Sequence, residues 1–88
     1  MCTSISRTAP ISGVGKGPKG WFPVVQATVA FDHATHSAAE HALLLDFADY
    51  DSGTDARVAL ELDLASGRVL LEQLRAAIAA AEATGLPG

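Results

Sequence analysis

Hydrophobic periodicity constrains the fold of this chain more than any other feature of its sequence. Apolar and polar residues alternate with a period of two in several stretches, as in β-strands with one buried face. A longer stretch near the C-terminus repeats with a period near 3.6, as in an amphipathic helix. The alternating stretches are residues 3–12, 23–32, 41–48 and 56–62, and the helical stretch is 64–84. The predicted element order is therefore β-β-β-β-α.

The ends of the predicted helix have clear signals. Asp63 is a good N-cap residue, and Gly85 stands where a glycine commonly ends a helix. Pro87 cannot continue the helix. The predicted apolar stripe consists of Leu70, Leu71, Leu74, Ala77, Ile78 and Ala81.

The predicted connections between the strands are short. Five of the eight residues at 13–20 are Gly or Pro, so we expect a loop there, with a second loop at 33–40 and a turn at 49–55. Short connections favour an antiparallel meander. We therefore predict an α+β fold, with a four-stranded antiparallel sheet and the C-terminal amphipathic helix on one face. Pro10 suggests that the first strand lies at an edge.

Length and composition limit the class of protein. The 88 residues, 49% of them hydrophobic, predict a single domain over 1–88. The only cysteine, Cys2, cannot form an intrachain disulfide, and no stretch resembles a signal peptide or a membrane span. We therefore expect a cytoplasmic protein. One helix covers only one face of a sheet, and the other face, with Leu44 and Ala30, is partly apolar, so we also expect a homodimer.

Charge is unevenly distributed along the chain. Every acidic residue lies from Asp32 onward, whereas the first 31 residues carry Arg7, Lys16 and Lys19. The net charge of −4 disfavours binding to nucleic acid, because phosphates would repel an acidic domain.

Four residues of metal-binding type gather at one end of the predicted sheet. In a meander, the first strand begins near Cys2, the second ends at His33, and the loop with His36 leads to His41 at the start of the third. A thiolate with imidazoles suits Zn²⁺ best, and Fe or Cu also fits. Asp32 and Glu40 would then serve as partners that orient imidazoles or as a base, and the alternative is that they are simply solvated. The alternative is that these histidines are ordinary surface residues.

The Gly-rich segment, residues 13–20, suggests another site. Its backbone N–H groups with Lys16 and Lys19 would form an anion nest, although a plain, flexible hairpin connection is the favoured explanation of the composition. The segment lacks the spacing of a P-loop. Trp21 and Phe22 follow it as a hydrophobic anchor of the core or as a contact for a ligand.

Two segments, from Gly15 to Phe22 and from Phe31 to Leu43, resemble a family of short actinobacterial proteins of unknown function, as does the Met-Cys-Thr start. The resemblance covers nearly the whole chain and implies that the four candidate ligands belong to one shared unit. It implies no activity. The leading hypothesis is a metal-binding domain, structural or catalytic. The alternatives are a non-enzymatic homodimeric interaction module with surface histidines, and a protein that binds a small molecule or anion at the Gly-rich segment.

Overall fold

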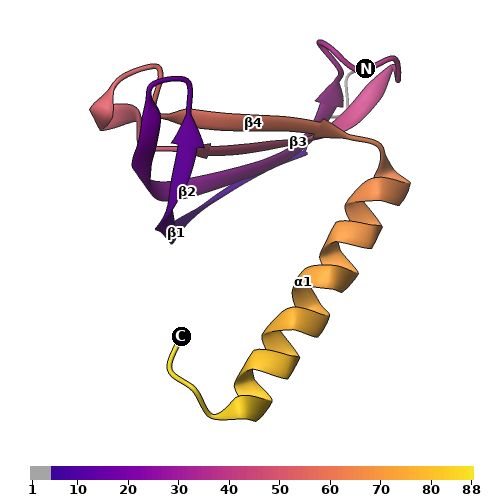
Figure 1. Cartoon of the computed structure of the whole chain (residues 1–88). Coiled ribbons are helices and arrows are strands. Elements are labelled where there is room, and N and C mark those ends of the chain that lie inside the picture. Colours follow the sequence, from indigo (N-terminus) through magenta and orange to yellow (C-terminus); the bar gives the residue numbers. More distant parts are fainter. Residues whose placement is uncertain (1–4) are drawn as a thin grey trace.

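A computed structural model describes residues 5–88 of the chain as one antiparallel sheet followed by one long helix (Figure 1). The strand order β1-β2-β3-β4 follows the sequence, so the predicted meander and α+β class are confirmed. The 3₁₀ turn Tyr50–Ser52 lies between β3 and β4. The strands are β1 (Ile5–Gly17), β2 (Gly20–His33), β3 (His41–Ala48) and β4 (Arg57–Leu62), and the helix is α1 (Leu64–Thr84).

The register places most large apolar side chains of the sheet on one face. Phe31 pairs with Leu43, which pairs with Leu62. Directly paired residues share a face, and α1 lies on this side, since a Cβ atom on Gly67 would clash with Leu43. We call this the inner sheet face. Its large apolar residues are Ile5, Val29, Phe31, Leu43, Leu45, Leu60 and Leu62, and the register also places Arg7 on this side, opposite Val29.

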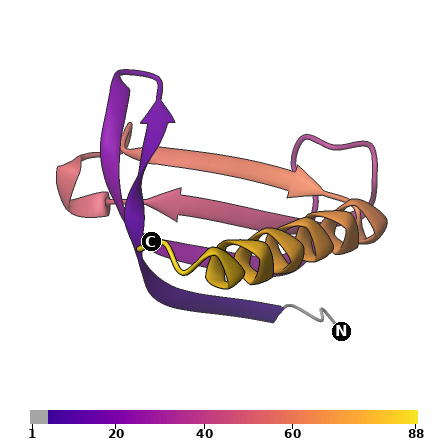
Figure 2. The same ribbon diagram turned by 60° about the horizontal axis from the view of Figure 1, so that its bottom comes forward.

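The far end of the β1–β2 hairpin turns away from the plane of the sheet (Figure 2). The pairing of β1 with β2 shifts between Pro10 and Gly13, as expected of a β-bulge, which bends and twists a strand. The bent hairpin packs on the loop before β4 and forms a small core. This core consists of Phe22, Val24 and Ala56, with Phe47 and Val58 partly buried against it.

The loop expected over residues 13–20 is mostly strand, and this prediction was wrong. Residues 13–17 pair with β2, and only Pro18 and Lys19 form the turn before Gly20, whose φ of 107° suits glycine. A Cβ atom on Gly17 would lie 2.8 Å from the carbonyl oxygen of Asp55. Glycine is therefore needed here for close packing of the strand rather than for flexibility.

The helix has the predicted bounds and ends. The Asp63 side chain accepts a hydrogen bond from the backbone N–H of Ser66 at 2.7 Å, and Gly85 ends the helix with a φ of 71°. However, α1 touches the sheet only near its first turns and then diverges from it (Figure 1). None of its residues is buried. Within residues 5–88, no helix has both the length and the apolar character needed to cross a membrane.

Two glycines of β1 provide a test of the hairpin packing. Gly17→Ala places a methyl group against the backbone of Asp55, so we expect a loss of about 1–3 kcal/mol in the free energy of unfolding. Gly13→Ala is the control, because nothing lies within 4 Å of its Cβ position, and alanine there adds up to about 1 kcal/mol of stability. Urea denaturation at equal protein concentration measures both, and equal effects would contradict this account of the hairpin.

Candidate functional site

The imidazoles of His33 and His41 lie next to each other where β2 ends and β3 begins. The two residues pair directly across the strands, and their ring centroids are 4.6 Å apart. Phe31 stacks on the His41 ring at 5.7 Å. The bond from the N–H of Ala34 to the carbonyl of Glu40 makes the histidines a non-hydrogen-bonded pair, in which side chains approach most closely. All three rings lie on the side of the inner sheet face.

Of the other two predicted ligands, the structure describes only His36, and it lies apart from this pair. Cys2 lies outside the described residues, although β1 does begin at this end, with Ile5 opposite Phe31. The Nδ1 atom of His36 lies 2.9 Å from the Thr35 hydroxyl. Across residues 5–88, no three His, Cys, Asp or Glu side chains are close enough to share a metal ion. Of the three candidate ligands among residues 5–88, the structure thus brings together His33 and His41.

His36 belongs to a loop that is held on the opposite face of the sheet. The anchor is Glu61 of β4, which pairs with Leu44 and so faces away from the inner sheet face. One carboxylate oxygen accepts hydrogen bonds from the backbone N–H groups of His36 at 2.9 Å and Ser37 at 2.8 Å. The other accepts from the N–H of Thr35 at 3.1 Å and from its hydroxyl.

This set of donors stabilises the ionised form of Glu61. Hydrogen bonds from the Thr35 hydroxyl and then from the backbone N–H groups of Ser37 and His36 lower the pKa of Glu61 to about 2. The Glu61 side chain is only 16% exposed, so this carboxylate is a structural anchor for the loop. It connects the loop after β2 to the strand that leads into α1.

The carboxylates expected to assist a metal lie elsewhere. Asp32 accepts a hydrogen bond at 2.7 Å from the backbone N–H of His33, not from an imidazole. The Glu40 side chain is exposed on the loop before β3. Both positions fit solvated residues that shape the backbone, so the described contacts give neither of them a place beside the paired imidazoles.

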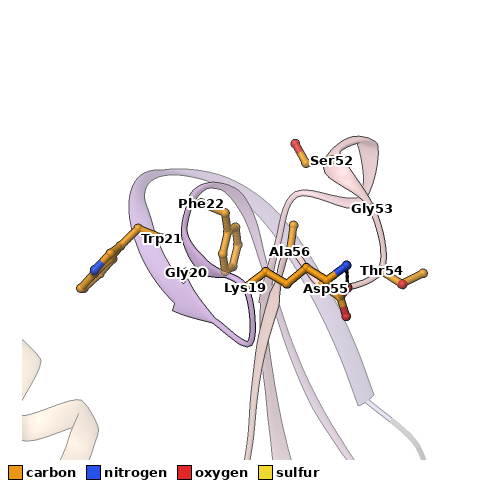
Figure 3. A pocket seen from close by; sticks show the side chains of 9 residues that line it. All are labelled: Lys19, Gly20, Trp21, Phe22, Ser52, Gly53, Thr54, Asp55 and Ala56. Carbon is orange, nitrogen blue, oxygen red and sulfur yellow. Dashed lines mark ion pairs between the residues drawn. The ribbon is translucent and has the colours of Figure 1, made fainter.

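A hollow of about 350 Å³ lies beside the turn of the Gly-rich segment (Figure 3). Lys19 Nζ forms an ion pair with Asp55 Oδ2 at 3.0 Å, so its charge is already matched by a carboxylate. Phe22 is buried, as expected of an anchor, whereas Trp21, which also lines the hollow, is 69% exposed. These contacts favour a structural hairpin over an anion nest.

Sequence reasoning did not find the part played by Glu61. The alternation of β4 correctly placed it on the face opposite Leu60 and Leu62. Its partners lie 24 to 26 residues earlier in the chain, in a segment without a periodic pattern. No local signal in the sequence connects the two, because loops carry no register that predicts which face they cross.

The lowered pKa of Glu61 predicts a pH-dependent stability. A carboxyl group whose pKa is lower in the folded state stabilises the fold fully above its ordinary value of 4.5, and this contribution is lost as the pH falls toward 2. We expect Glu61→Gln to lower the melting temperature at pH 7, and we expect the difference from the wild type to narrow below pH 4.5. Glu40→Gln, an exposed carboxylate on the same loop, serves as the control. A difference that stays constant with pH would refute this account.

The comparisons with known proteins agree with the resemblance seen in the sequence. No curated protein and no solved structure matches the chain. One family model does match, over residues 1–87, and so covers almost the full length. The chain belongs to DUF6295, a family of unknown function.

Proposed function

We propose that this chain is a non-enzymatic interaction module that acts through self-association. The observation that supports this proposal is the large surface that one chain leaves exposed. A chain of this size that folded by itself would cover much more of its apolar surface. The exposed surface beyond that of such a monomer includes apolar residues of the sheet and of α1. The proposal corresponds to the second of the functions that the sequence suggested.

The size of the surplus can be estimated. One chain of 9.0 kDa exposes 6714 Å², whereas a compact monomer of this mass exposes about 4,900 Å². The surplus of roughly 1,800 Å² is about twice the area that each partner buries in a standard protein interface. The radius of gyration, 14.8 Å, likewise exceeds the value of about 12 Å expected for a compact domain of this length.

The core within one chain is correspondingly small. Among residues 5–88, the buried hydrophobic residues are Phe22, Val24, Ala42, Ala48 and Ala56, and no large side chain is fully buried. Domains of this size are only modestly stable even when well packed. A second copy would supply the missing apolar contacts, and this supports an obligate homodimer.

The position of the partner differs from the sequence-based expectation. The sequence suggested that a partner covers the face with Leu44 and Ala30, but both residues are already half-buried. On the inner sheet face, Leu43 and Leu45 are half-buried too, but Val29 is 41% exposed and Leu60 is 42% exposed, although α1 lies on that side. The proposed interface therefore includes the inner sheet face.

Two adjacent residues of β4 test this proposal. Leu60→Lys puts a charge on the inner sheet face and should lower the mass in solution from that of two chains toward 9.0 kDa. Ala59→Lys, an exposed position on the other face, should leave the mass unchanged. Light scattering with size-exclusion chromatography measures the mass, and circular dichroism checks that both variants are folded. A wild-type protein that is monomeric at micromolar concentration would refute the proposal.

A second candidate function is the binding of a transition metal, and the His33–His41 pair supports it. Neutral imidazoles are good ligands for Zn²⁺, and also for Fe and Cu ions. Two imidazoles on paired strands need only small side-chain rotations to share one ion, and water completes the coordination of such an open site. Cys2 would add a thiolate, as the sequence suggested. Zn²⁺ remains the favoured metal.

Titration of the untagged protein with Zn²⁺ tests the metal site. We expect one ion per chain, with at least tenfold weaker binding in His33→Ala and in His41→Ala, since each removes one of the two paired ligands. His36→Ala is the matched control, because its ring lies on the other side of the sheet and its loss should not change the affinity. If all three variants bind Zn²⁺ as the wild type does, the site does not exist.

A further inference from the structure

The helix α1 and the inner sheet face of one chain leave apolar side chains exposed in the open angle between them (Figure 1). At 100° per residue, the apolar positions that follow Gly67 and lie within about 60° of it are Leu70, Leu71, Leu74, Ile78 and Ala81, which we call the inner stripe of α1. Glu82 lies at the edge of this stripe, near the end of the helix. Leu74 is 53% exposed and Ile78 is 56% exposed. Since Val29 and Leu60 on the sheet are also exposed, the two apolar surfaces do not cover each other.

The connection to β4 prevents α1 from closing onto its own sheet. Only Asp63 separates the end of β4 from the start of α1, and its side chain caps the helix through Ser66. The base of the helix already touches the sheet, because a Cβ atom on Gly67 would clash with Leu43. A single capped residue and a close contact therefore fix the direction in which α1 leaves the sheet.

A second copy of the chain offers the surface that both elements lack. In a two-fold symmetric dimer each copy presents the same patch, so one arrangement covers both helices and both sheets. The middle of the inner stripe carries no charged residue, as expected when the stripe is the centre of an interface. Arg68, Glu72 and Arg75 lie on other sides of α1, and Glu82 lies at the edge of the stripe in the last turn. The surplus of roughly 1,800 Å² per chain is ample for such a contact.

The length of α1 also matches the length of the sheet strands that it would cover. The 21 residues of α1 span about 31 Å, and the eight residues of β3 span about 26 Å. One helix can therefore cross the inner sheet face of a partner from end to end.

We propose that, in the homodimer, the inner stripe of α1 from each copy packs on the inner sheet face of the other copy. This inference rests on the proposed self-association and adds the partner and the elements that meet. Each sheet is then covered by the partner's helix rather than by its own, and the apolar core is completed between chains.

Photocrosslinking between distinguishable copies tests this arrangement. Full-length chain with p-benzoylphenylalanine at position 78 is refolded together with ¹⁵N-labelled, unmodified chain, and the crosslinked peptides are identified by mass. We expect Ile78→p-benzoylphenylalanine to crosslink to β2, β3 or β4 of the labelled copy. The same probe at Ala76, which lies on the opposite side of α1, should give at least fivefold fewer crosslinks to that sheet.

The outcomes separate this inference from the proposal on which it rests. A dimer whose crosslinks from position 78 fall only within one chain, or miss the labelled sheet, overturns the helix placement and leaves self-association standing. A monomer in the mass measurement overturns both. As a second readout, Ile78→Glu should raise the dimer dissociation constant about tenfold or more, while Ala76→Glu should leave it unchanged. Equal effects of the two substitutions on this constant also overturn the placement of the helix.

Discussion

The single residue between β4 and α1 determines how much of this chain can be buried. Asp63 ends the strand side of the junction and caps the helix in the same position, so no flexible segment lets the helix turn back. The contact of Gly67 with Leu43 fixes the first turns of α1 on the sheet. Beyond that point the helix diverges, and the apolar surface of both elements stays open. The short, capped junction thus limits packing within one chain and leaves an apolar surface that a second chain can cover.

Other contacts of the sheet bury only part of the apolar surface that α1 leaves open. The bulge between Pro10 and Gly13 bends the β1–β2 hairpin over the loop before β4, and Phe22 and Val24 become buried there. This packing requires the close approach that Gly17 permits. At the other end of the sheet, Glu61 secures the loop after β2 through three backbone N–H groups. Both features fix the path of the backbone, but neither buries the large side chains of the inner sheet face.

The sequence predicted the elements well and their packing poorly, for physical reasons. The bounds of β3 and α1 were correct because alternation and helix capping are local signals, and the N-cap at Asp63 and the end at Gly85 are confirmed. The segment at 13–20 was misassigned because glycine at alternate positions has the composition of a loop, although here it allows strands to pack closely. The convergence of the strand ends was correct, and it brought His33 beside His41. The loop with His36 crosses to the other face, and no periodic pattern could predict that side.

The geometry of the sheet edges favours association through a face rather than through strand pairing. An edge strand recruits another strand only where a long row of backbone groups is regular and free. In β1, Pro10 provides no N–H donor, and the register shift that follows interrupts the row. At the other edge, β4 is only six residues long and leads directly into α1. The apolar surface of the inner sheet face and the inner stripe therefore offers the contact of largest area, and side-chain packing rather than backbone pairing would determine its specificity.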